Sequence, residues 1–219
     1  MFLNGVRPNG EYLDGVMPYW QFHAMTPEDA DSIVAYLRTV PAYEHRDKPS
    51  ETPWYPTAAP ARPLDATKVF MPSASAPNYD ALVRGRYLAT LACIGCRTPD
   101  AYPRGAVPSA PLPVDETRLF AGGTAFEASI FHFPLPRFPA KIYSQNLTQD
   151  ATGLAGYQVQ DILNELKLGK AKDGSNLCPP MPAAKEGFNG LTDTDAHDIA
   201  EFILALPPIS NKRPDDCKL

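Results

Sequence analysis

The sequence lacks the features of a membrane-spanning or nucleic-acid-binding chain. No stretch approaches the roughly 20 consecutive apolar residues that span a bilayer, and no basic, then apolar, then small-residue leader opens the chain. We therefore expect a soluble chain with no transmembrane segment, whose export signal has been removed or lies outside the sequence. The formal net charge of −5 lacks the basic excess of a nucleic-acid binder and suits docking to a basic patch on a partner protein.

The sequence also lacks the common catalytic signatures. It has no nucleophile elbow, no phosphate-binding glycine loop and no HExxH motif. His23, His45 and His197 show no partner pattern, and His197 falls on the polar side of the last expected helix. No alternation of strands and helices of the βαβ kind is visible, while proline, at 25 of 219 residues, is about twice as frequent as usual. These patterns predict a non-catalytic protein that is mostly α with long irregular loops.

An internal repeat organises the two ends of the chain. Residues 5–18, GVRPNGEYLDGVMP, match residues 169–182, GKAKDGSNLCPPMP, at one fixed offset. After a two-residue insertion the match resumes between AMTPEDADSIVAYLRTVPA (24–42) and GLTDTDAHDIAEFILALPP (190–208). So many identities in one register indicate two copies of one structural unit.

Each copy ends in a predicted amphipathic helix. Thr26 and Thr192 are in the position of N-caps, each followed three residues later by an aspartate of a capping box, and a proline closes each helix at 41 and 207. We expect both apolar faces to be buried, at Ile33, Leu37, Ile199, Ile203 and Leu206. Two more helices are expected, from 79 to about 91 and from about 157 to 169.

Between these helices lies a C-x-x-C pair, Cys93 and Cys96. Such a pair anchors a c-type haem when a histidine follows, but here Arg97 follows. The residues alone leave other possibilities: a small disulfide, two free thiols, or a zinc site made with Cys178 and His132, which lacks a second paired cluster. A thioredoxin-like redox pair would need a βαβ setting, which is absent. Cys178 and Cys217 are either a disulfide pair or unrelated.

The order helix, C-x-x-C, long loop, helix, Met-Pro loop and final helix resembles a class I cytochrome c domain over residues 79–208. The segments GRYLATLACIGC, IYSQNLTQDATGLAGY, LCPPMP and GLTDTDAHDIAEFILALPP look like those of multi-haem cytochrome c subunits that serve membrane-bound alcohol and sugar dehydrogenases. The repeat extends the resemblance to 1–42, read as the C-terminal half of another such domain. Residues 43–78 are then a Pro-rich linker, either packed down through Trp54, Tyr55 and Phe70 or a flexible tether, and residues 209–219 are a tail.

The resemblance implies a cofactor and a function. Cys93 and Cys96 would attach haem c, and Met181 would be the distal iron ligand and the metal-binding residue. The protein would carry single electrons between redox partner proteins, as a subunit of a larger complex, in the periplasm or another exported location. Met17 stands at the equivalent position of the first copy, but no C-x-x-C precedes it, so we expect a core residue in a remnant, or in a fragment of a longer protein.

Arg97 departs from the family pattern at the proximal ligand. A guanidinium has no free lone pair at accessible pH, so it is not an ordinary iron ligand. Three explanations stay open: another ligand, with His132 the nearest candidate along the chain; a haem-free subunit that kept the fold as a scaffold; or an error at one sequence position. In each case we expect the Arg97 guanidinium to contact acid groups, backbone carbonyls or water, because a buried unpaired charge is costly.

Overall fold

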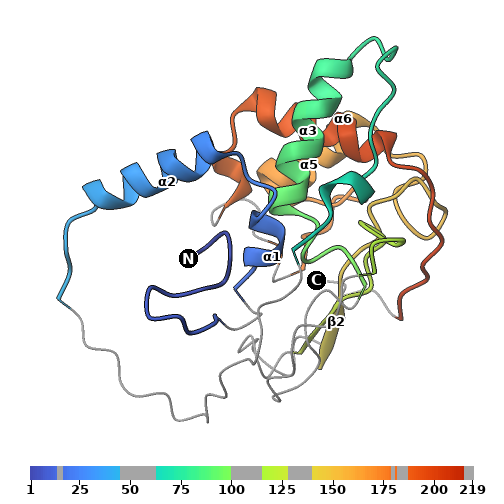
Figure 1. The fold of residues 1–219 in the computed structure, drawn as a ribbon. Helices are drawn as coiled ribbons and strands as arrows, with labels where there is room; N and C mark the ends of the chain where they lie inside the picture. Colours follow the sequence, from blue (N-terminus) through green and yellow to red (C-terminus); the bar gives the residue numbers. More distant parts are fainter. Residues whose placement is uncertain are drawn as a thin grey trace.

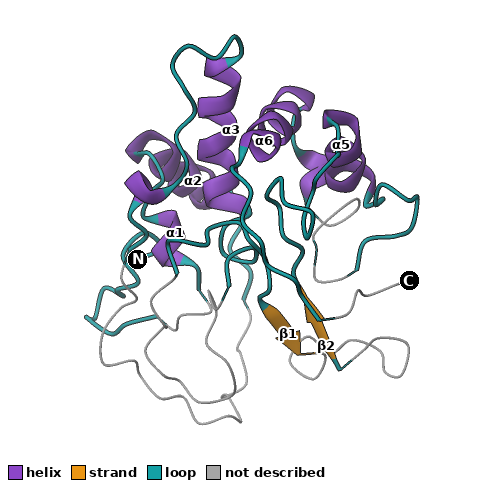
Figure 2. Cartoon of the chain, turned by 90° about the vertical axis from the view of Figure 1, so that its right-hand side faces the viewer, coloured by secondary structure: helices purple, strands orange, loops and turns teal. Residues whose placement is uncertain are grey.

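The fold is built mainly from helices joined by long loops, as expected (Figures 1 and 2). The computed structural model describes residues 1–13, 17–44, 63–99, 115–127, 140–178, 181 and 187–214. None of the helices in these ranges is long and apolar enough to cross a membrane. The elements are, in order, α1 (Tyr19–Phe22), α2 (Pro27–Thr39), η1 (Ala66–Lys68), α3 (Tyr79–Ala92), β1 (Ala125–Glu127), β2 (Lys141–Tyr143), α5 (Val159–Leu168), η3 (Phe188–Gly190) and α6 (Asp193–Ala205).

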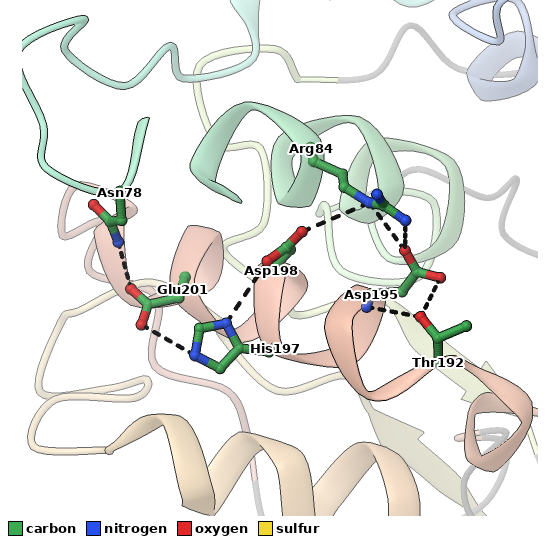
Figure 3. Close-up of polar contacts among 7 residues, drawn as sticks. All are labelled: Asn78, Arg84, Thr192, Asp195, His197, Asp198 and Glu201. Atoms are coloured by element: carbon green, nitrogen blue, oxygen red, sulfur yellow. Dashed lines mark hydrogen bonds and ion pairs between the residues drawn. The ribbon is translucent and has the colours of Figure 1, made fainter. Parts of the chain in front are cut away.

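The crossing of α3 and α6 is the central packing contact. The two backbones approach so closely that a Cβ on Gly85 would lie 1.8 Å from the carbonyl oxygen of Asp198. Only glycine permits such an approach without a shift of one helix. Polar contacts flank the crossing in Figure 3: Arg84 bonds Asp195, and Asn78 donates to Glu201 at 2.7 Å.

The predicted apolar face of α6 is buried, as expected. Ile199, Ile203 and Leu206 are 1%, 3% and 3% exposed. Phe202 packs edge-on against Phe120, with ring centroids 5.8 Å apart. The polar face carries His197, whose side chain is 50% exposed and lies near Asp198 and Glu201, as Figure 3 shows. The periodicity therefore predicted both faces of this helix.

The matching prediction for α2 is wrong. Ile33 and Leu37 are 39% and 58% exposed, although the helix and its Thr26 cap form as expected. The reason is that α2 is anchored near its start, where the Tyr87 hydroxyl of α3 accepts from the Thr26 amide and donates to the Asp29 carboxylate. The rest of α2 extends away from α3, α5 and α6 in Figure 1, so its apolar stripe has no described neighbour to pack against.

The segment before α2 is part of the main core. Tyr19 and Trp20 of α1 are almost fully buried in the same apolar cluster as α6. The side-chain amide of Gln21 donates to the backbone carbonyl of Leu91 at 2.9 Å. The backbone amide of Leu64 donates to the backbone carbonyl of Trp20. Residues 1–44 are therefore tied to α3 through α1 and the first turn of α2.

The loops 5–13 and 169–177, which begin the two copies of the sequence repeat, have the same backbone geometry. Gly5 and Gly169 have φ of 67° and 66°, and Gly10 and Gly174 have φ of 88° and 83°. A bridge joins Val6 to Tyr12 in one loop and Lys170 to Asn176 in the other, at equivalent positions. Equivalent hydrogen bonds close both loops, from Leu13 to Gly5 at 2.7 Å and from Leu177 to Gly169 at 2.9 Å.

The predicted linker packs down where it is described. Leu64 and Val69 are buried in the main core, and Phe70 packs against it. Arg86 of α3 holds this segment by donating to the carbonyl oxygens of Val69 and Phe70. Trp54 and Tyr55 lie outside the described residues.

Candidate functional site

The C-x-x-C pair lies at the carboxyl end of α3. Cys93 ends the helix, Ile94 is fully buried, and the Arg97 amide closes the turn by donating to the carbonyl of Cys93 at 3.0 Å. Both cysteines are thiols, Cys93 buried and Cys96 partly exposed. The structure therefore contains no disulfide between Cys93 and Cys96.

A cavity of about 960 Å³ opens beside this turn. Its size falls within the range of about 300–1,000 Å³ that is usual for cofactor and ligand sites. Its wall combines apolar side chains from β1, β2, α5 and α6 with a few charged groups. The lining includes Cys93, Cys96, Arg97, Phe126, Ile142, Leu154, Tyr157, Ile162, Glu165, Leu166, Met181, Ile203, Lys212 and Arg213.

The side chains of Arg97 and Met181 meet in this cavity. Nη2 of Arg97 donates a hydrogen bond to Sδ of Met181 at 3.0 Å, and Nη1 donates to the carbonyl of Gln145 at 3.4 Å. The carbonyl contact agrees with the expectation for Arg97, whereas the sulfur contact was not foreseen. The two residues at the expected axial-ligand positions are therefore brought together, 84 positions apart in the chain.

Haem c fits this site in part. The thiols of Cys93 and Cys96 and the sulfur of Met181 line one cavity of suitable volume, which matches the attachment and distal positions. The proximal position does not match, because a guanidinium offers no lone pair. The Met181 sulfur accepts a hydrogen bond from Arg97 at 3.0 Å, so it would have to leave Arg97 to bind an iron.

The backbone at Arg97 is fixed by the loop 120–124. The Gly122 amide donates to the carbonyl of Arg97 at 2.7 Å, and the Thr124 hydroxyl donates to the carbonyl of Thr98 at 2.6 Å. Phe120 lies at φ 64°, a left-handed conformation that is strained for an aromatic residue. Its buried ring and its two hydrogen bonds, with Thr98 and Leu147, hold this conformation. The position of Arg97 is thus determined by tight packing.

A buried carboxyl group, Glu165 of α5, lines the same cavity. Its pKa is raised by burial, while the Arg97 charge and a hydrogen bond with Tyr157 act in the opposite direction. Oε1 of Glu165 is buried and has no hydrogen-bond partner within the described part of the chain. Burial also raises the pKa of Tyr157, and the Glu165 charge adds to that shift. The cavity therefore holds a polar group that its own walls do not fully satisfy.

The Cys93 thiol is buried and remains protonated. Burial raises the pKa of Cys93 to about 12, against a smaller opposing effect of Arg97, so this thiol is protonated at neutral pH. No group of three or more His, Cys, Asp or Glu side chains is placed to hold a metal within the described ranges. Cys178 is disulfide-bonded. Cys217, one of the two possibilities for its partner in the sequence, and the candidate ligand His132 lie outside those ranges.

Several site residues were missed at the sequence level. Gln145 and Glu165 belong to no catalytic or ligand-binding motif that the sequence shows. The segment assigned as a tail also contributes, because Asn211 donates to the carbonyls of Ala121 and Gly122, and Lys212 and Arg213 line the cavity. Such contacts depend on the path of loops, for which the hydrophobic pattern has no signal.

Met17 does not take the place expected for it. Its side chain is 40% exposed, so it is not the core residue that we expected. The core position in this region is taken by the next aromatic pair, Tyr19 and Trp20. Met17 and Met181 thus differ in environment, although they match in the sequence repeat.

Curated proteins with similar sequences carry one description. No protein-family model matches the chain. The "Alcohol dehydrogenase (quinone), cytochrome c subunit" of Gluconacetobacter polyoxogenes and that of Komagataeibacter europaeus are each 28% identical over 217 residues, covering 94% of this chain and 42% of the relative. The subunit of the same name from Gluconobacter oxydans (strain 621H) is 31% identical over 137 residues, covering 60% of this chain and 23% of the relative. The chain thus spans less than half the length of these relatives, and nearly all of it is similar to cytochrome c subunits of quinone-dependent alcohol dehydrogenases.

Proposed function

We propose that this chain is a cytochrome c-type electron-transfer subunit of a redox complex and makes or breaks no substrate bond itself. The observation that carries the proposal is the convergence of Cys93, Cys96 and Met181 on one cavity of about 960 Å³. The similarity to the named cytochrome c subunits along 94% of the chain supports it independently. The expected partners are redox proteins and the other subunits of such a complex, in an exported, periplasmic location.

In this proposal the cavity residues have distinct roles. The Cys93 and Cys96 thiols would hold the macrocycle covalently, and the Met181 thioether would be the residue that offers a sulfur ligand after leaving Arg97. When bound, haem c supplies a one-electron couple whose potential depends on its ligands and surroundings. The apolar wall formed by Leu154, Ile162 and Ile203 excludes water. Lys212 and Arg213 offer positive charge to carboxylate groups at the cavity wall.

We also propose that residues 1–42 are the second half of another cytochrome c-like domain. The equal φ angles at Gly5 and Gly169, and the equivalent bridges that follow them, support a common origin for the two loops. The relatives are more than twice as long as the matched region, which leaves room in them for further domains of this kind.

A second candidate function is a haem-free subunit that keeps the fold as a scaffold. The hydrogen bond between Arg97 and Met181 favours it, because it joins the two axial positions to each other. The Arg97 cation at the cavity wall also lowers the cost of the buried Glu165 carboxylate. The two candidates differ in one observable, the presence of covalent haem.

The visible spectrum of the purified protein tests the proposal. We expect protein produced together with haem-attachment machinery to show a strong Soret band, which is lost in the double variant Cys93→Ser, Cys96→Ser. The Met181→Ala variant should keep the Soret band and lose the far-red band of methionine ligation. A folded but colourless wild-type protein would overturn the electron-transfer proposal and support the scaffold.

A further inference from the structure

One face of α2 is an exposed apolar stripe, which we call the α2 face. It consists of Ile33, Tyr36, Leu37 and Val40, of which Tyr36 and Val40 are 69% and 50% exposed. These residues recur at helical spacing, so they lie on one side of the helix. The opposite side carries Glu28, Asp31 and Arg38. Contiguous exposed apolar residues rimmed by charge mark an interaction surface.

The sequence repeat gives each residue of the α2 face an equivalent in α6. Ile33, Tyr36, Leu37 and Val40 match Ile199, Phe202, Ile203 and Leu206. All four α6 residues are at most 3% exposed. The two helices have the same length, the same threonine cap and the same apolar positions, and they differ in whether a neighbour covers those positions. The α2 face is therefore built like a buried one.

Two described helices, α3 and α5, pack against α6, and the contact with α3 is the more extensive and has a specific chemistry. Gly85 of α3 allows close contact, since a Cβ there would lie 2.9 Å from the Cβ of Phe202. The adjacent Arg84 bonds Asp195 in the first turn of α6, as Figure 3 shows. A helix that covers α6 thus combines a small residue at the crossing with an arginine next to it.

The first turn of α2 is matched to the same kind of partner. Asp29 is the equivalent of Asp195, and Glu28 stands beside it, so this turn carries negative charge. Tyr87 donates to one Asp29 oxygen, Oδ2. An ionised carboxylate accepts several hydrogen bonds, so Asp29 has room for an arginine as well.

We propose that the α2 face is the docking site for a second helix of the α3 type, supplied by a neighbouring cytochrome c-like domain. This helix carries a small residue at the crossing and an arginine that pairs with Asp29. It packs against the α2 face as α3 packs against α6, and it pairs with the half-domain that we propose for residues 1–42. The inference rests on the repeat and on the exposure of α2, and it does not depend on whether the cavity holds haem.

The test supplies such a helix. A second copy of residues 78–92 is fused to the N-terminus through a flexible Gly/Ser linker, which raises its effective concentration at α2. Hydrogen exchange of the α2 amides is then compared with that in the unfused chain. We expect exchange in α2 to slow by about tenfold or more, since burial of a face suppresses local opening. A fused helix of the same composition in scrambled order should give no slowing.

Matched variants of α2 show whether the face itself is bound. Leu37→Asp and, as a second variant, Tyr36→Asp place a charge on the α2 face and should abolish the slowing. Ala35→Asp places the same charge on the opposite side and should preserve it. Absence of slowing with the fused helix, or equal sensitivity to Leu37→Asp and Ala35→Asp, would overturn the proposal. So would α2 amides that are already protected in the unfused chain, or a dimer of the unfused chain that Leu37→Asp dissociates.

Discussion

At residue 97 a cation occupies the place where the resembling family has an iron ligand. Its contacts explain how the chain tolerates this change. The guanidinium reaches the Met181 sulfur and the Gln145 carbonyl and lowers the cost of the Glu165 charge. The sequence predicted acid groups, backbone carbonyls or water as partners of Arg97, because a buried charge needs polar atoms around it. It could not predict the sulfur, since that contact depends on where the fold places Met181.

Restoring a histidine at this position gives the first prediction. We expect Arg97→His, produced with haem-attachment machinery, to bind haem covalently and to show an ordinary Met/His spectrum, because the other attachment and ligand groups already line the cavity. Arg97→Gln, which also lacks an iron-binding lone pair on its side-chain nitrogen, is the control. A folded Arg97→His protein that stays colourless would show that the cavity is not a haem site.

The buried carboxyl group gives a prediction on pH. Because burial raises the pKa of Glu165 above its ordinary value of 4.5, the folded chain holds this proton to higher pH than the unfolded chain. The free energy of unfolding should therefore fall as pH rises from about 4.5 to the raised pKa, with a slope of up to about 1.4 kcal/mol per pH unit, and then level off.

Urea unfolding of wild type and Glu165→Gln across this pH range measures the effect. The variant should lose this part of the pH dependence, because glutamine does not titrate. Glu28→Gln, an exposed position on α2, is the matched surface control. Superimposable pH profiles for wild type and Glu165→Gln would contradict the assigned pKa shift.

At the level of elements, α2 and α6 show what a sequence pattern determines and what it does not. Thr26 and Thr192 cap their helices by accepting from the Asp29 and Asp195 amides, at 3.2 and 3.0 Å, as the local sequence predicted. Capping and periodicity depend on neighbouring residues, so they can be read from the chain. Burial depends on a partner element. Among the described elements, α3 and α5 pack against α6, whereas none covers the apolar stripe of α2. The expectation for α2 failed for this reason, while the helix itself was predicted.

Truncations at equivalent positions of the two helices should therefore differ in cost. Ile203→Ala removes a buried side chain and should lower the free energy of unfolding by about 2–5 kcal/mol. Leu37→Ala, at the matching exposed position, should cost less than about 1 kcal/mol. Urea denaturation of both variants measures these values. Equal costs would contradict the assignment of α2 as an uncovered copy of α6.

The close crossing of α3 and α6 gives a prediction about overpacking. In Gly85→Ala the new methyl group would lie 1.8 Å from the Asp198 carbonyl oxygen, so α3 and α6 must separate. The overpacking should cost about 1–3 kcal/mol, more than the roughly 1 kcal/mol that alanine gains over glycine in a helix. Gly190→Ala is the control, because no atom lies within 4 Å of its Cβ position. Thermal unfolding compares them, and a Gly85→Ala protein as stable as wild type would contradict the close crossing.

At the level of the whole molecule, the order of segments predicted which helices and which methionine would surround the cavity, but it did not predict the loops that complete the cavity wall. The helix before Cys93, the loop that carries Met181 and the final helix were recognised in sequence, and the structure assembles them around one space. The loop 144–147 and the residues Lys212 and Arg213 complete its walls. Their paths follow from hydrogen bonds such as that of Asn146 with Ile209, at 2.8 Å. Long-range bonds of this kind leave no local sequence pattern.

The most direct test of a haem-bearing cytochrome c-type fold is the intact mass of the denatured wild-type protein after production with haem-attachment machinery. Denaturation removes any haem that is not covalently attached, so the mass reports the thioether bonds of Cys93 and Cys96 alone. We predict the mass of the polypeptide plus one haem, and the mass of the polypeptide alone for Cys93→Ser, Cys96→Ser. A wild-type protein with the mass of the polypeptide alone would contradict a covalently haem-bearing electron carrier.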